Sequence, residues 1–316
     1  MPNSRLLAVL LLPPAAAAQT VPHYVPLNPA IASRSAVYFQ PFVPAGSGTG
    51  GSITVDYANA VEPGATSDRR EYIFDSELMQ VDLWITRNLS DRWFLLGNLA
   101  LRSAHDGFLD SFLNGYHDVI GFKVPARNRR PLDTYGWQFS LPGREVDIPR
   151  QRAFLGDLRL GAGHRIGRTQ VVATVTLPTA TNSVPEWSRG TIGTALNVTS
   201  RVMNRERISI DAGGAIGWTP VHGDLADHQR TVFLAGMGSV RWRALGSQVL
   251  FGSLFVQSAN WKETGFTALE GPEITLDFGA LLSLRQGWPL LQVGMTEDLL
   301  PRGPAVDADF RLGVHW

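Results

Sequence analysis

One stretch of the sequence combines the side chains that could bind a metal ion. His222, Asp224, Asp227 and His228 all lie within "VHGDLADHQ". Two imidazoles and two carboxylates would suit a divalent transition metal, which accepts nitrogen and oxygen ligands. Their spacing matches no known metal motif, and polar residues are common in surface loops. We therefore expect no metal here, and no other cofactor.

Hydrolytic chemistry would need a serine within reach of a histidine. The sequence has no G-x-S-x-G element of the kind that positions a hydrolase nucleophile. Ser111 and His117 form the only plausible pair, and six residues apart on a helix is poor geometry for contact. We do not expect an enzyme, although a lipid hydrolase is kept as the least favoured alternative.

Charged residues also recur in a regular pattern, at every second position of several stretches. At the end of the chain, "DADFRLGVHW" places Phe310 and Leu312 on one side and Asp309 and Arg311 on the other. Side chains alternate in this way on a β-strand with one apolar face. Opposite charges on a shared inner face would pair, but a water-filled pore would show the same alternation. The candidate lumen-lining residues are Asp82, Asn98, Arg102, Asp157, Arg159, Asp211, Arg241, Glu273, Asp277, Asp309 and Arg311.

The elements that would carry these residues are long alternating strands. Short turns separate some of them and long loops separate the others, which is the pattern of outer-membrane barrels. The chain is rich in turn residues, with 32 Gly and 20 Pro. We predict an all-β, transmembrane, antiparallel up-and-down barrel of about twelve strands, with 14 as the alternative. The predicted strands are 50–59, 77–88, 91–103, 153–165, 168–179, 190–201, 206–218, 229–243, 246–257, 272–284, 288–298 and 305–316.

The longest predicted outer loop, 104–152, contains a helix at 107–121 and a small hairpin in "YGWQFSLPGREVDIP". Apolar residues of the helix recur at spacings of three and four. One hypothesis makes it a lid or plug that contacts a ligand or guards the lumen. The other makes it a helix packed on the outer loops. The candidate ligand or gating residues are Phe108, Asp110, Phe112, Tyr116, His117 and Asp118.

Tryptophans fall near the predicted rims of the barrel. Trp prefers the membrane interface, where its ring is buried and its N–H stays hydrated. Lipids of the outer membrane are therefore expected partners. The terminal aromatic residue resembles the signal by which barrel-assembly machinery recognises its substrates, so that machinery is a second expected partner. The predicted interface girdle is Trp93, Trp218, Trp242, Trp288 and Trp316.

The start of the chain has the features of an export signal. Arg5 precedes a short apolar run, and Ala15–Ala18 offer a cleavage site, so residues 1–18 are a predicted signal peptide. Residues 19–49 would then be a periplasmic segment or a plug, and residues 50–316 the barrel. The 28 basic and 28 acidic residues balance, which argues against a nucleic-acid partner. No cysteine is present, so disulfides are excluded.

Several stretches together resemble an uncharacterised family of Gram-negative outer-membrane β-barrels, close to the clan of fatty-acid-transporter-like and phenol-degradation-associated barrels. They are "DSELMQVDLWITRNLSDRWFL" (75–95), "GFLDSFLNGYHDVIGF" (107–122), "FLGDLRLGAG" (154–163), "VTLPTAT" (175–181) and "TEDLLPRGPAVDADFRLGVHW" (296–316). The resemblance implies the barrel fold and the outer membrane, and it brings no catalytic residue, substrate or cofactor.

Taken together, these patterns favour an outer-membrane barrel that passes or binds a small solute, with hydrophobic compounds as one class. The alternative is a plugged structural or interaction barrel whose outer loops bind a partner.

Overall fold

A computed structural model describes residues 21–316 except 26, 29–31, 47, 67, 69, 122–129, 183, 185–186 and 301–307. The predicted signal peptide, residues 1–18, lies outside the described residues. Within the described part of the chain, none of the helices is long and apolar enough to cross a membrane.

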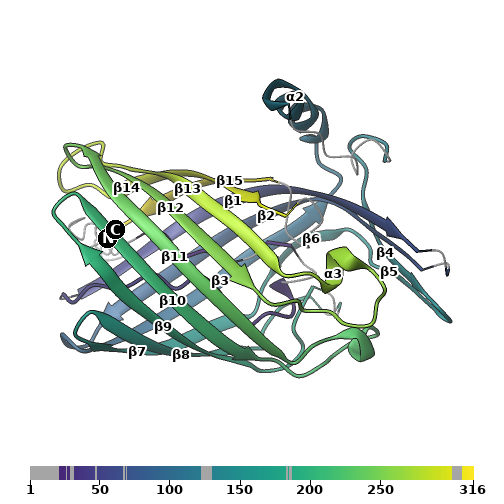
Figure 1. The fold of residues 1–316 in the computed structure, drawn as a ribbon, viewed down its shortest axis with the longest axis horizontal. Helices are drawn as coiled ribbons and strands as arrows, with labels where there is room; N and C mark the ends of the chain where they lie inside the picture. The colour runs from purple at the N-terminus through teal and green to yellow at the C-terminus, as the bar shows by residue number, and fades with distance from the viewer. Residues whose placement is uncertain are drawn as a thin grey trace, which may run out of the picture.

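Twelve antiparallel strands close into a barrel, which confirms the predicted fold class (Figure 1). The last strand closes the ring by pairing with the first, from Ser52 opposite His315 to Asn59 opposite Ala308. Closure gives every strand two neighbours, so the backbone needs no hydrogen bonds from the surroundings. The strands are β1 (Gly48–Ala65), β2 (Glu71–Asn88), β3 (Trp93–His105), β7 (Leu158–Ile166), β8 (Thr169–Leu177), β9 (Gly193–Asn204), β10 (Ile208–Trp218), β11 (Val232–Leu245), β12 (Gln248–Gln257), β13 (Glu273–Leu282), β14 (Leu290–Asp298) and β15 (Ala308–His315).

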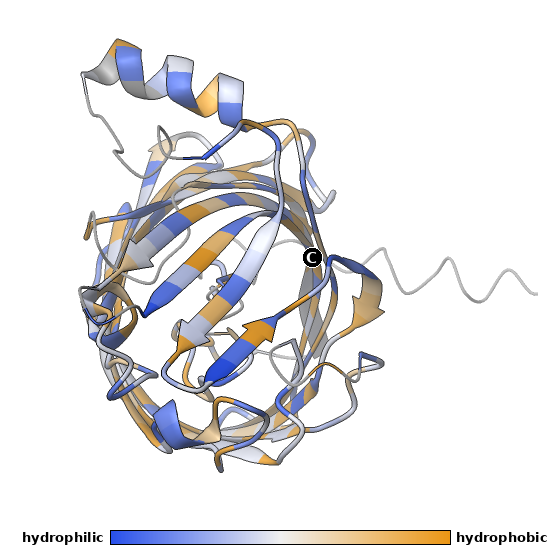
Figure 2. Ribbon diagram, turned by 90° about the vertical axis from the view of Figure 1, so that its right-hand side faces the viewer, coloured by the Kyte–Doolittle hydropathy of each residue, from blue (hydrophilic) through white to orange (hydrophobic). Residues whose placement is uncertain are grey.

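Side chains alternate between the two faces of the wall, as the sequence pattern predicts. On β15, Leu312 and Val314 are exposed on the outside, whereas Asp309 and Arg311 are buried inside. Figure 2 looks into the barrel and shows strands that alternate between hydrophobic and hydrophilic residues. The exposed apolar face forms a band around the barrel, as the lipid-facing surface of outer-membrane barrels does.

The predicted hairpin is present as β4 (Gly136–Leu141) and β5 (Arg144–Asp147). It also continues the barrel sheet, because β4 pairs with the N-terminal end of β2, with Tyr72 opposite Phe139. Its apolar residues join a cluster near the long loops that includes Trp137, Trp187 and Trp261. The short helices α3 (Thr267–Glu270) and η4 (Ala226–His228) lie in the loops between β10 and β13.

Two predicted boundaries were wrong. Residues 60–76 were expected to form a loop, but β1 and β2 extend through most of this range, and Pro63 pairs with Ile73. Pro63 lies beyond Asn59, the last residue of β1 that pairs with β15 in the described part of the chain, and proline in a strand favours such an edge position. The predicted strand 153–165 is interrupted, since β6 (Gln151–Leu155) ends before β7 begins at Leu158.

Candidate functional site

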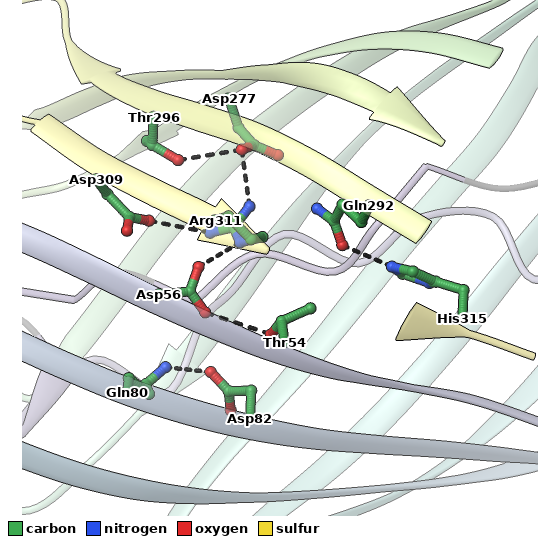
Figure 3. Close-up of polar contacts among 10 residues, drawn as sticks. All are labelled: Thr54, Asp56, Gln80, Asp82, Asp277, Gln292, Thr296, Asp309, Arg311 and His315. Atoms are coloured by element: carbon green, nitrogen blue, oxygen red, sulfur yellow. Dashed lines mark hydrogen bonds and ion pairs between the residues drawn. The ribbon is translucent and has the colours of Figure 1, made fainter. Parts of the chain in front are cut away.

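One side of the barrel interior gathers carboxylates around a single arginine (Figure 3). The Arg311 guanidinium lies 2.7 Å from Asp277 Oδ1 and 3.2 Å from Asp309 Oδ2. It also forms an ion pair with Asp56. All four residues are buried. One guanidinium carries a single positive charge, so it cannot neutralise three carboxylates. The cluster therefore makes this side of the interior acidic.

The same side continues along β2 and β13. Asp82 accepts hydrogen bonds from Gln80 and from Asn98, the latter at 2.8 Å. Glu273 is also buried, and its Oε2 has no hydrogen-bond partner among the described residues. The acidic residues of β13, β15, β1 and β2 therefore lie on four strands of one arc of the barrel, because β14 alone separates β13 from β15.

Arginines gather on the other arc, formed by β3 and β7 to β11. Arg201 binds Asp211 with two hydrogen bonds of 2.9 and 3.2 Å. Arg159 instead lies over the ring of Tyr38, 4.5 Å from its centroid, and two of its nitrogens have no partner among the described residues. Arg241 donates to Ser209 at 3.1 Å. Positive and negative charge are thus largely separated across the interior.

The structure places each predicted lumen-lining residue on the inner side of the wall. Two of them, Arg102 and Asp157, are only half-buried, and the others are buried. It brings Asp277, Asp309 and Arg311 into one cluster. It does not pair Arg102 or Arg159 with a carboxylate by an ion pair among the described contacts. The expectation of a ladder of mixed pairs therefore describes only part of the interior.

Residues 21–44 occupy the interior alongside these charges, apart from the positions that the structure does not describe. Phe39 and Tyr24 pack in one apolar cluster with Phe251 and Phe255, which point inward from β12. The wall facing the segment therefore carries apolar side chains at β11 and β12. Gly217 on β10 makes room for the segment, because a Cβ there would lie 3.1 Å from the Ala36 Cβ.

Hydrogen bonds from the wall hold the middle of this segment. The Gln170 side chain accepts the Val43 N–H at 2.8 Å and donates to the Pro41 carbonyl at 2.7 Å. Thr199 donates to the Gln40 carbonyl at 2.8 Å. The wall therefore contacts the backbone of the segment as well as its side chains.

Arginines bind the segment backbone at two further places. Near the tight strand turns, Arg165 donates to the carbonyls of Val43 and Pro44 at 2.7 and 3.0 Å. Near the long loops, Arg189 donates to the Ser35 carbonyl at 2.5 Å. None of these anchoring residues was identified from the sequence, because the alternation pattern shows which face a residue occupies but not which loop or segment it meets.

The helix predicted at 107–121 is present as α2 (Asp110–Ile120). Figure 2 shows it outside the ring of strands, and it does not lie over the opening. Phe112 packs against Phe310, which points outward from β15. The lid hypothesis therefore does not fit the position of α2. Glu77 and Asn59 bind the start of the helix, and both point outward from the wall, away from the lumen. The side chain of His117 lies outside the described residues.

The other predicted sites are dispersed. His222 and His228 lie in the loop around η4, and among the described residues no three His, Cys, Asp or Glu side chains are grouped to hold a metal. Trp93, Trp218, Trp242 and Trp288 are exposed on the outside of the barrel, and Trp316 is half-buried beside Gly51. Their role at a membrane interface stays a prediction.

Comparisons with known proteins agree with this fold. A family model described as "Protein of unknown function (DUF3187)" matches residues 40–316. Among solved structures, the chain is similar to the COG4313 outer membrane channel from Pseudomonas putida F1. The TM-score is 0.54 at 15% identity, over 88% of this chain and 98% of that one. None of the curated proteins matches the chain.

Two further similarities are weaker. The translocator domain of the autotransporter NalP from Neisseria meningitidis gives a TM-score of 0.44 at 10% identity, over 86% of this chain and 88% of that one. A Pseudomonas aeruginosa FadL homologue gives 0.42 at 8% identity, over 94% and 99%. The match to the family model and the similarity to the Pseudomonas putida channel confirm the predicted resemblance to an uncharacterised outer-membrane barrel family.

Proposed function

The chain belongs to this family of unknown function, DUF3187, and we propose that it is an outer-membrane channel for small hydrophobic solutes, closed in this state by residues 21–44. The observation that carries the proposal is which part of the chain fills the barrel. The interior is occupied by a segment that precedes β1 in the chain and forms none of the described strands of the wall. Such a segment can leave without unfolding the barrel.

The wall behind the segment supports the choice of a hydrophobic solute. Phe233, Met237, Phe251 and Phe255 point inward from β11 and β12 and contact the segment in one cluster. If the segment moved away, these side chains would form an apolar strip along the passage. Ligand sites are commonly apolar surfaces with a few polar groups that fix orientation, and here the neighbouring charges would supply those groups. The similar Pseudomonas putida protein is named an outer membrane channel, which agrees with this function.

The location follows from the same proposal. We place the barrel in the outer membrane, with residues 1–18 as the export signal and lipids around the exposed apolar band. The strand turns at 89–92 and 167–168 then face the periplasm, and the hairpin β4–β5 faces the outside.

A second function is favoured by one observation. The outer end of the barrel carries its own aromatic cluster, in which the Trp137 and Trp187 rings meet at 4.6 Å. A barrel closed at this end as well would suit a structural or interaction role, with the outer loops binding a partner.

Deletion of residues 21–44 separates the two functions. The purified deletion protein, checked for folding by its heat-dependent gel mobility, would be compared with the full chain in planar lipid bilayers. The channel proposal expects the deletion to produce steady conductance and to raise uptake of a small aromatic hydrocarbon into proteoliposomes. A folded deletion protein that conducts and transports no more than the full chain would favour the interaction barrel.

A further inference from the structure

Helix α2 stands beside the outer half of the barrel wall, away from the lumen (Figures 1 and 2). Its ring of Phe112 meets the ring of Phe310 at a centroid distance of 6.1 Å. Phe108, just before the helix, lies 5.5 Å from Tyr57. Both partners point outward from the last and first strands, so the helix is in contact with the apolar band that surrounds the barrel.

Polar contacts hold the helix in this place. The Glu77 carboxylate accepts the N–H groups of Phe108, at 2.7 Å, and of Leu109. Asn59 donates to Asp110 at 3.0 Å, and the Tyr116 hydroxyl reaches Glu297 at 3.5 Å. Glu77, Asn59 and Glu297 lie on three different strands, β2, β1 and β14. The helix is therefore docked across the outside of the wall at several points.

The strand register gives the depth of this docking. Glu297 pairs with Ala308, which lies eight residues before the chain end at the periplasmic rim. Eight residues of a tilted strand rise about 20 Å, less than the roughly 25 Å height of the apolar band in such barrels. Phe310 lies lower still. The contact of Phe112 with Phe310 therefore falls within the depth of the acyl chains.

Beyond its contacts with the wall, the helix region leaves a stripe of apolar side-chain surface exposed at this depth. Phe108, Phe112 and Val119 are 67%, 58% and 87% exposed. Phe112 and Val119, seven residues apart, share one face of α2, and Phe108 precedes the helix. Leu113 points the other way and is fully buried against the protein. Ser111 and Asp118 are exposed at the polar edge. The exposed stripe would face water in a soluble protein, but here it continues the lipid-facing band.

We infer that α2 is a membrane-docking helix, whose stripe of Phe108, Phe112 and Val119 inserts among the acyl chains of the outer leaflet. This inference rests on the proposed location of the barrel in the outer membrane. The occupant is lipid because the stripe is continuous with the band at Phe310 and lies at acyl-chain depth. Burial of apolar side-chain surface in lipid is favourable, so the stripe stabilises the helix at this depth.

The chain contains no cysteine, so single cysteines can carry a nitroxide label at chosen positions. The full chain with Phe112→Cys or Val119→Cys would be labelled and reconstituted into phosphatidylcholine vesicles. Asp118→Cys, at the polar edge of the same helix, is the matched control. Leu312→Cys reports the lipid-facing wall, because Leu312 is 58% exposed on the outside of β15. Collision with oxygen, which concentrates in lipid, and with a water-soluble nickel chelate would be measured by electron paramagnetic resonance.

The inference expects labels at positions 112 and 119 to collide mainly with oxygen, as the label at 312 does, and the label at 118 to collide mainly with nickel. Nickel accessibility at 112 and 119 equal to that at 118 would overturn it while leaving the barrel in the membrane. Spin–spin coupling between copies at 112 would also overturn it, in favour of a second copy as occupant. A water-exposed label at 312 would instead contradict the membrane location itself.

Discussion

At the scale of single residues, the Arg311 cluster gives a prediction for the free energy of unfolding. Replacing Arg311 by Met would leave Asp56, Asp277 and Asp309 buried beside one another without their cation. Breaking a buried pair in this way costs about 3–5 kcal/mol. Urea unfolding of the detergent-solubilised or vesicle-bound protein should show this loss for Arg311→Met. Adding Asp56→Asn and Asp277→Asn should restore part of it. An unchanged unfolding midpoint for Arg311→Met would show that the cluster does not hold the wall together.

Gly217 tests how closely the segment fits the wall. A phenylalanine there would collide with Ala36 and Val37, which lie 3.1 and 3.0 Å from the position of the added Cβ. Overpacking costs about 1–3 kcal/mol, and a free-energy change of that size shifts a two-state equilibrium about 5- to 150-fold. Gly217→Phe should therefore raise the fraction of time that the channel conducts.

The matched control for Gly217 is Gly236 on β11, where an added Cβ meets nothing within 4 Å. Gly236→Phe should leave conductance at the level of the unmodified chain. Equal conductance from both variants, whether high or low, would contradict a specific fit between the segment and β10.

At the scale of elements, the last strand carries a prediction about assembly. The backbone of Trp316 exchanges two hydrogen bonds of 3.0 Å with Gly51, and its ring covers the Gly51 Cα. Removing Trp316 would take away both the end of the closing seam and the aromatic residue that resembles an assembly signal. We expect a smaller fraction of the protein to be inserted in the membrane in cells. This fraction would be measured as the heat-modifiable form relative to the total amount of the protein. Full insertion without Trp316 would argue that closure between β1 and β15 needs no terminal residue.

The strands could be predicted from the sequence because their signal is local. Asp309, Phe310, Arg311 and Leu312 alternate with a period of two, and that period alone assigns each residue to a face. The position of α2 could not be predicted in the same way. Its amphipathic pattern shows that one face is covered, but whether lumen, loops or lipid covers it depends on Glu77, Asn59 and Glu297, which are far away along the chain.

At the scale of the whole molecule, the acidic strands, the basic strands and the enclosed segment come together inside the closed barrel. The sequence indicated charged residues inside and gave two options for residues 19–49, a periplasmic segment or a plug. It could not show the separation of acidic and basic strands, because that separation arises only when β15 closes against β1. The contacts of Gln170, Thr199 and Arg165 with the segment backbone could not be predicted for a related reason. Every residue has a backbone carbonyl, so the sequence does not show which carbonyls accept these hydrogen bonds.

The most direct measurement of the central claim is conductance through a barrel whose segment is covalently held. Ala36→Cys with Gly217→Cys would place two thiols across the contact between segment and wall, in a chain with no other cysteine. The account predicts a closed barrel in planar bilayers while the disulfide is oxidised, and conductance that appears on reduction above the level of either single variant. Equal conductance in the oxidised and reduced states would contradict the claim that residues 21–44 close the passage.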